Sequence, residues 1–442
     1  MASTYNVNAS TKDFRVAIIG GGMCGLACAV GLSRFGIHAD VFESASKFDE
    51  VGAGVDLGSN ALRALKGLGV LDTILARGDD SKPHGRAMLF VSGLGAHEEV
   101  YDYNNSSIFT DADAGMGIYR SSLDISPDFL NALLPLLPNP NATHFNKRCT
   151  SISTSTSGAQ VIHFADGTTH EADLVIGADG IKSTSRNAVA GTDKKLLQFT
   201  NTVAYRGMVP MDTLRQEGVK TEVGRRLCNF VGIDKHIIAF PIKFGKIVNI
   251  VAFATDNSVP VGSVEVNGPW VEPVPQQELL DRFSGWGHDV MAMLNHLKTP
   301  SKWSIHTLTP LETFVRGKIV LVGDAAHAMP PHLGAGVGQG FEDVFLLCEL
   351  LGHPSTNLSN LEDVLKAYDA IRQPWANMVL KESFRTGVIY EAFGKPGYGV
   401  DDMAGHLAGR REPIWRHDLD GDVASAIAGL RERVSFPAVT NE

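Results

Sequence analysis

Three glycines near the start of the chain have the spacing of a phosphate-binding turn. Gly20, Gly22 and Gly25 form a GxGxxG motif, and Glu43 closes the next apolar run. In this motif one glycine permits a tight turn, one lets a pyrophosphate approach the backbone, and one lets the helix pack against the strand. The helix N-terminus then faces the phosphate charge, and a carboxylate at Glu43 can accept hydrogen bonds from a ribose. The pattern predicts a dinucleotide site; the alternative is a glycine-rich turn in an unrelated α/β domain.

Two more motifs follow apolar runs much later in the chain. Residues 179–186 read DGIKSTSR, which fits DGxxSxxR, and residues 323–327 read GDAAH. The segment 330–336, PPHLGAG, continues the second motif. A GxGxxG turn serves both NAD and FAD, so these later motifs decide between the two cofactors.

With these three motifs in this order, the chain resembles the class A FAD-dependent aromatic hydroxylases, which share the para-hydroxybenzoate hydroxylase fold. Its nearest resemblance is to the salicylate hydroxylase-like group, and it extends from about Arg15 to Asp418. The resemblance implies FAD as the cofactor, NADH or NADPH as a transient co-substrate, and O2 and a small phenol as reactants. No second GxGxxG occurs, as expected in this family, and the choice between NADH and NADPH stays open.

The resemblance also implies which residues hold FAD. Arg120, in the segment YRSSL at 119–123, matches a family arginine that contacts FAD; the alternative is an ordinary surface arginine. Asp324 would bind the ribityl chain, and the backbone of about 333–336 would line the flavin pyrimidine edge. The full set of expected cofactor contacts is Gly20, Gly22, Gly25, Glu43, Gly54, Arg120, Asp179, Gly180, Asp324, Gly334, Ala335 and Gly336.

The residues at 334–351 support the flavin placement on physical grounds. Gly334 and Gly336 permit close approach of the backbone to a flat ring. Apolar residues then follow at helical spacing: Val337, Phe341, Val344, Phe345, Cys348 and Leu351. A helix that begins here would direct its positive end at the flavin and stabilise the reduced, anionic ring.

Five residues are candidates for the chemistry at the substrate. Arg206, in the segment YRG, could clamp a carboxylate or phenolate with its planar guanidinium, or pair with a structural acid. His236 could help to deprotonate a phenol, although a structural histidine is the alternative. Phe240 stands where some relatives carry a substrate-anchoring tyrosine. Pro331 would shape the wall beside the reacting ring, and His332 lies near the expected reaction site, whereas His327 is expected to be structural.

The implied reaction is hydroxylation of a phenol, and its most specific form converts salicylate to catechol with release of CO2. Hydroxylation of another hydroxybenzoate or of a polyketide-derived phenol is an alternative. A flavin reductase or oxidase without oxygen transfer, and a non-catalytic flavin-binding protein, are further alternatives on the same fold.

The positions of these motifs predict an α/β fold. Apolar runs at 15–19, 39–43, 173–177 and 318–323 read as parallel strands, with helices at about 24–35 and 60–68, the second capped by Ser59. Alternating runs at 202–208 and 248–254 indicate an antiparallel sheet. We therefore expect a Rossmann-like FAD-binding domain (residues 1–82, 106–190 and 304–375), interrupted by a mostly antiparallel β-sheet substrate-binding domain (83–105 and 191–303). A C-terminal helical region (376–442) follows.

Composition narrows the remaining choices. The net charge of -10 argues against a nucleic-acid partner, which calls for a basic surface. Five cysteines without a CxxC pair support neither a disulfide framework nor a zinc site, so no metal is expected. No signal peptide or membrane span is apparent, so a cytoplasmic protein without a membrane partner, monomeric or homodimeric, is the expectation.

Overall fold

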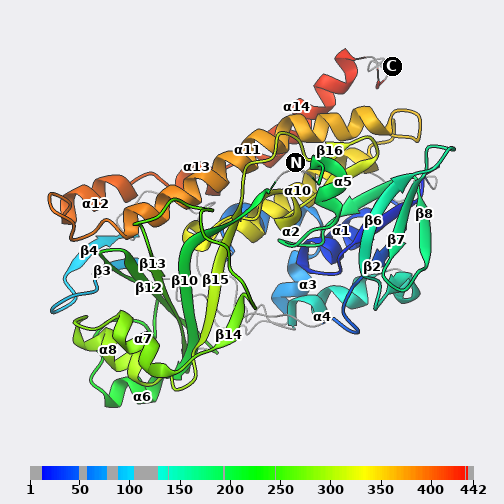
Figure 1. The fold of residues 1–442 in the computed structure, drawn as a ribbon. Coiled ribbons are helices and arrows are strands. Elements are labelled where there is room, and N and C mark those ends of the chain that lie inside the picture. Colours follow the sequence, from blue (N-terminus) through cyan, green and yellow to red (C-terminus); the bar gives the residue numbers. More distant parts are fainter. Residues whose placement is uncertain are drawn as a thin grey trace.

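The computed structural model describes residues 12–48, 57–76, 88–103, 128–137, 139–192, 195–243, 245–433 and 435–436. It confirms the predicted fold class: an α/β unit is interrupted in sequence by a β-rich unit and followed by helices. Figure 1 shows the two units beside each other, with the long helix α11 (Leu361–Tyr390) running past both.

The first unit is built on a six-stranded sheet with the order β16-β17-β9-β1-β2-β5. Neighbouring strands are parallel except β16 and β17. The strands are β1 (Val16–Ile19), β2 (Ala39–Phe42), β5 (Thr143–His144), β9 (Leu174–Gly177), β16 (Val315–Arg316) and β17 (Ile319–Leu321). All four predicted apolar runs lie in this sheet, and every residue of β1, β9 and β17 is buried, as parallel strands covered on both faces require.

Helices and a small sheet surround these strands. The helices are α1 (Met23–Ser33), α2 (Ser59–Gly67), α3 (Leu71–Ala76), α4 (Asp128–Leu133), α5 (Ser185–Ala190), α9 (Asp324–His327) and α10 (Gly336–Gly352), with short 3-10 turns at Leu134–Leu136, Pro140–Ala142 and Pro331–Leu333. The small sheet consists of β6 (Cys149–Thr154), β7 (Gln160–Phe164) and β8 (Thr169–Ala172). The prediction that Ser59 caps α2 was wrong. Gly58 precedes the helix, and the Ser59 hydroxyl donates instead to the Trp415 carbonyl at 2.7 Å.

The second unit is an eight-stranded sheet with the order β14-β15-β10-β13-β12-β11-β3-β4. Its strands are β3 (Leu89–Ser92), β4 (Glu99–Asp102), β10 (Leu197–Pro210), β11 (Cys228–Gly232), β12 (Lys235–Ile242), β13 (Ile247–Thr255), β14 (Val271–Pro273) and β15 (Ser301–Leu308). The predicted runs 202–208 and 248–254 lie in β10 and β13, which pair antiparallel. Only β3 and β11 are parallel among the described pairs of this sheet.

The two faces of the eight-stranded sheet carry different partners. One face packs on α6 (Met211–Gln216), α7 (Gln276–Arg282) and α8 (His288–Asn295), and its core includes Tyr205, Ile237, Ile250 and Ala252. Because side chains alternate along a strand, the neighbouring residues Arg206, Ile238 and Val251 point to the opposite face. That face looks toward the first unit.

The expected domain boundaries at 303–304 and 375–376 fall inside continuous elements. The first lies within β15, which pairs with β10 as far as Leu308, and the second lies within α11, whose internal Pro374 does not end the helix. The chain closes with α12 (Val400–Leu407), α13 (Glu412–Trp415) and α14 (Leu419–Glu432). In the part of the chain that the structure describes, none of the helices has both the length and the apolarity that crossing a bilayer needs.

Candidate active site

The glycine turn between β1 and α1 leaves room for a ligand at one position only. Gly20 has φ +102°, and a Cβ on it would lie 2.4 Å from the Ala178 carbonyl oxygen. A Cβ on Gly25 would lie 1.9 Å from the Gly20 oxygen, so this glycine lets α1 pack against β1. At Gly22, by contrast, a Cβ would meet no atom within 4 Å. The protein itself therefore gives no reason for glycine there, whereas a pyrophosphate crossing the start of α1 would.

Glu43, directly after β2, lies against this turn. One carboxylate oxygen accepts from the Gly21 amide at 2.8 Å, and the other accepts from the Ala45 amide at 2.7 Å. These bonds fix the carboxylate at the edge of the glycine turn. The second oxygen also accepts from the Ser44 hydroxyl at 3.1 Å, so the oxygen that faces Gly21 is the one that keeps acceptor capacity for a ribose hydroxyl.

The Asp179 carboxylate closes the loop that follows β9. It accepts from the backbone amides of Thr184 (2.8 Å) and Ser185 (3.0 Å) and from the Ser183 hydroxyl (2.5 Å). Gly180 follows with φ +72°, a conformation that favours glycine. Asp179 therefore fixes the shape of this loop by binding the loop's backbone amides.

Arg186 joins this loop to the turn at 323–327, which carries the GDAAH motif and is called the GD turn below. The motif pattern did not reveal this role. Its buried guanidinium donates to the Ile181 carbonyl at 2.6 Å and to the Ala325 carbonyl at 3.1 Å. Two segments that lie far apart in sequence are thus held together by one side chain.

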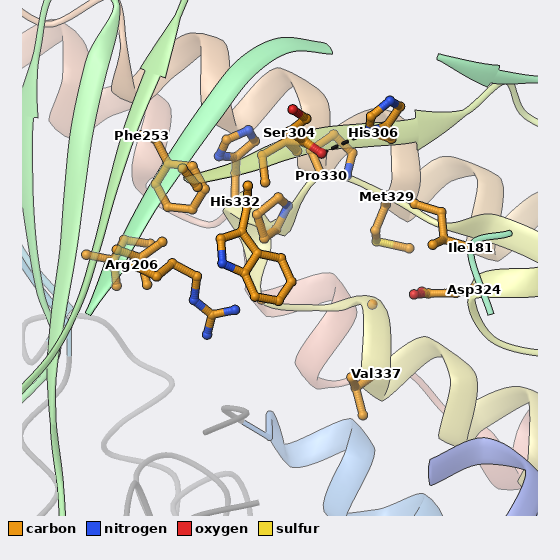
Figure 2. A pocket seen from close by; sticks show the side chains of 18 of the residues that line it. Ile181, Arg206, Phe253, Ser304, His306, Asp324, Met329, Pro330, His332 and Val337 are labelled. Carbon is orange, nitrogen blue, oxygen red and sulfur yellow. Dashed lines mark hydrogen bonds between the residues drawn. The ribbon is translucent and has the colours of Figure 1, made fainter. Parts of the chain in front are cut away.

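The GD turn projects Asp324 into the cavity between the two units (Figure 2). Burial raises the pKa of the Asp324 carboxyl, and the charges of His327 and Arg186 oppose that shift. His327 faces the other way and donates to Asp343 at 2.6 Å. Asp343 also accepts from the Gly323 amide at 2.9 Å and from Arg372 at 2.7 Å, so a buried ionic network fixes the turn.

The segment 330–336 forms the adjoining side of the cavity. Pro331 and His332 lie in its 3-10 turn, Gly334 has φ +62°, and Ala335 is the N-cap of α10, which begins at Gly336. Pro331, Gly334 and Gly336 line the cavity. The unpaired amides at the start of α10 lie at the cavity, where they favour negative charge.

A cavity of about 500 Å³ lies between these turns and the eight-stranded sheet. Its sheet wall alternates along the strands, as the pleat requires. The wall consists of Ala204, Arg206, Ile238, Phe240, Ile242, Val251, Phe253, Trp303 and Ile305. Trp270 lines the cavity as well. The sequence did not identify Phe253, Trp303 or Trp270 as cavity residues. Phe253 could have been found, because it stands two residues after Val251 on the same face of β13.

Arg206 is the cation of the sheet wall. Its guanidinium lies over the Trp303 ring, 4.9 Å from the centroid, and burial lowers its pKa. Figure 2 shows the side chain directed into the cavity. A half-buried cation beside an aromatic ring suits a planar anion.

The two candidate histidines differ in their access to the cavity. His332 lines it, and burial and then His236 hold the pKa of His332 well below its usual value. His236 is fully buried outside the lining, because its ring stacks on Phe253 at 4.5 Å and meets His332 at 5.1 Å. Its Nδ1 donates to Glu391 at 3.2 Å. The predicted contacts Gly54 and Arg120 lie outside the described residues.

These residues fit an FAD molecule. The open position at Gly22, the amide-rich start of α1, the Asp324 carboxylate in the cavity and the exposed start of α10 lie where a dinucleotide and a flat ring would need them. The cavity beyond them then remains for a substrate.

Replacing Asp324 by alanine is expected to give largely colourless protein. Loss of a charged acceptor that lines the cavity should weaken FAD binding by about tenfold or more. The measurement is flavin absorbance per protein, with FAD titration of the stripped protein. Asp324→Asn is the matched control, because its amide oxygen still accepts; full flavin content in Asp324→Ala would remove this residue from the cofactor site.

Comparison with known proteins gives a consistent result. The sequence model of a family described as "FAD binding domain" matches residues 13–383. Two salicylate hydroxylases of Pseudomonas putida are 39% and 40% identical, over 94% and 95% of this chain and 95% and 96% of theirs. A solved structure described as a salicylate hydroxylase substrate complex matches with a TM-score of 0.83 and 33% identity, covering 98% of this chain and all of that one.

Proposed function

This chain belongs to the FAD-binding family of class A aromatic hydroxylases, and we propose that it converts salicylate to catechol with release of CO2. It is an FAD-dependent aromatic monooxygenase that uses NAD(P)H and O2 on a small-molecule substrate. The observation that carries the choice of salicylate is the near full-length likeness to salicylate hydroxylases. An arginine inside a largely apolar cavity agrees with it, because salicylate is a small aromatic carboxylate.

Bound FAD supplies the activation of O2, with electrons from NAD(P)H, so that one oxygen atom enters the ring and the other leaves as water. Arg206 binds the substrate carboxylate or phenolate and sets which ring carbon faces the flavin. Attack at the carboxyl-bearing carbon forms the new C–O bond there. Cleavage of the bond to the carboxylate then releases CO2 and restores the aromatic ring.

The remaining cavity residues orient the ring and exclude water. The substrate packs against Phe240, Pro331 and the aromatic side chains of the sheet wall. This packing keeps water out of the cavity during oxygen transfer, so that less of the activated oxygen is lost as H2O2. Because Phe253 and His332 cover His236, we assign His236 to positioning: held by Glu391, its ring supports the cavity side chain of His332.

The apolar part of the sheet wall favours a second candidate, another hydroxybenzoate or a polyketide-derived phenol. Ile238, Phe240 and Ile242 offer no side-chain polar group, so this part of the cavity suits an apolar ring substituent. A panel of substituted phenolic acids would rank these candidates against salicylate.

Salicylate is expected to stimulate NAD(P)H oxidation strongly in the FAD-loaded enzyme and to yield catechol. The assay follows NADH and NADPH separately, identifies the product by mass, and uses ¹⁸O2 to show that one labelled oxygen enters catechol. Benzoate, which lacks the hydroxyl group, is the control. Stimulated NAD(P)H use that yields only H2O2 would favour a flavin oxidase, and no stimulation at all would exclude salicylate as substrate.

A further inference from the structure

Among the described residues of the C-terminal region (376–433 and 435–436), Arg411 is the one that lines the cavity. Arg411 immediately precedes α13 and lies beyond residue 383, where the family match ends. Its side chain lines the same cavity as Asp324 and Gly334, and only 5% of the residue's surface is exposed. A buried cation from outside the matched domain therefore borders the site.

Arg411 donates to the backbone of the turn that precedes α10. One nitrogen donates to the Leu333 carbonyl at 2.8 Å, and another donates to the His332 carbonyl at 3.4 Å. The Tyr390 hydroxyl reinforces the second contact: it donates to the His332 carbonyl at 3.2 Å and accepts from Arg411 at 3.1 Å. Two consecutive carbonyls of a buried turn are thus held from the C-terminal side.

The same turn is also held by residues earlier in α11, the helix that ends at Tyr390. The Ser383 hydroxyl donates to the Pro330 carbonyl at 2.5 Å and accepts from the Leu333 amide at 3.2 Å. Gly387 packs so closely on the His332 ring that a Cβ there would lie 2.5 Å from it. The turn is therefore fixed by both α11 and Arg411, and its residues Pro331, His332 and Gly334 line the cavity.

Arg411 is itself held in place. It lies against the rings of Tyr103 (5.9 Å) and Trp415 (5.7 Å). The Trp415 carbonyl accepts from Ser59 and from Arg63, both at 2.7 Å, so the segment around Arg411 is anchored to α2. Because the donors of a guanidinium lie in one rigid plane, fixing the Arg411 side chain also fixes the direction of its hydrogen bonds to the turn.

We propose that Arg411 is a positioning residue of the oxygen-transfer site: it fixes the backbone of His332 and Leu333 and thereby the wall that faces the flavin and the substrate. The proposal rests on the proposed function in that it takes this wall to border the flavin. Through Arg411, the C-terminal region would then contribute to the oxygen-transfer site as well as to the packing of the protein.

The test compares Arg411→Met with Arg410→Met, one residue earlier. Methionine keeps a long, unbranched side chain but has no hydrogen-bond donor. Arg410 donates to the His406 carbonyl and pairs with Glu382, away from the cavity lining. Two quantities are measured on each protein: the FAD dissociation constant of the stripped protein, and the share of consumed NAD(P)H that appears as hydroxylated product rather than H2O2.

For Arg411→Met we expect FAD to bind about tenfold more weakly or worse, because two buried carbonyls lose a charged donor. We expect the product share to fall below about half, with the difference released as H2O2, because a displaced wall admits water. Arg410→Met is expected to stay within about twofold of wild type in both quantities, because the partners of Arg410, the His406 carbonyl and Glu382, lie outside the cavity lining. Arg411→Lys should recover only part of the loss, because an ammonium group cannot serve both carbonyls in one fixed plane.

Wild-type values in Arg411→Met, or equal losses in Arg410→Met, would overturn the proposal. If Arg411→Met does not fold, Tyr390→Phe decides, because it removes the hydroxyl that joins Arg411 to His332; we expect weaker FAD binding and more H2O2, and wild-type values would contradict us. The FAD titration needs no substrate, so it still tests Arg411 if salicylate is not turned over. Failure of the proposed function would show separately, as absence of catechol from the wild-type enzyme.

Discussion

Replacing Gly22 by alanine is expected to give a folded protein that no longer retains FAD. Gly22 has φ -73° and ψ -170°, which any residue adopts, and a Cβ there meets no protein atom within 4 Å. The added methyl group would instead stand at the start of α1, where the pyrophosphate must approach the backbone. We expect FAD affinity to fall by at least about 100-fold, because the phosphates lose their contact with the helix amides.

The measurement for Gly22→Ala is FAD titration of the stripped protein, together with its thermal unfolding midpoint without FAD. Gly429→Ala in α14 is the matched control, because a Cβ added there would also meet no atom of another part of the chain within 4 Å. Gly25→Ala provides the contrast: its Cβ would lie 1.9 Å from a carbonyl oxygen, so the fold itself should suffer. Unchanged FAD affinity in Gly22→Ala would mean that the pyrophosphate does not cross this turn.

Replacing Arg206 by alanine is expected to raise KM for salicylate by about 30-fold or more, because an anion in a desolvated cavity loses its charged partner. Burial lowers the pKa of Arg206, as expected for a cation that is partly removed from water. FAD content should not change, because no FAD contact is assigned to this side chain. Steady-state kinetics over a range of salicylate concentrations gives KM directly.

Arg206→Lys separates charge from shape in this prediction. Lysine keeps the positive charge but loses the planar pair of donors, so we expect an intermediate KM. An unchanged KM in Arg206→Ala would instead assign the side chain to supporting Trp303, over whose ring it lies.

Local motifs allowed much of the fold to be predicted. The runs at 15–19, 39–43, 173–177 and 318–323 are short, apolar and bounded by glycine or acidic turns, and all of them form strands of the first sheet. The glycines at 20, 22 and 25 could be placed because their spacing is local: Gly20 and Gly25 avoid clashes within the turn, and Gly22 leaves room for the pyrophosphate. The family and the cofactor followed from the order of the three motifs.

Features that depend on distant contacts could not be predicted. Ser59 has the residue type of an N-cap, but a tertiary contact with Trp415 uses its hydroxyl. His236 stands on the cavity face of β12, yet Phe253, its partner across the strands, covers it. Arg411 reaches the site from the last helices, where no motif marks it. Such roles follow from packing between segments, and spacing along one segment carries no trace of them.

The eight-stranded sheet has a further consequence for how substrate choice can diverge. On β12 the odd-numbered Ile237 and Ala239 belong to the core beneath α6, α7 and α8, whereas the even-numbered Ile238, Phe240 and Ile242 line the cavity. Ile238 and Phe240 also pack against a second buried cluster, which includes Phe90 and Tyr390. Exchanges at the even positions therefore leave the core beneath the helices unchanged, so the reaction chamber can be remodelled from one face of the sheet while the other face keeps its packing. The pleat of the sheet thus places the residues that shape the substrate space and the residues of the helix-covered core on opposite faces.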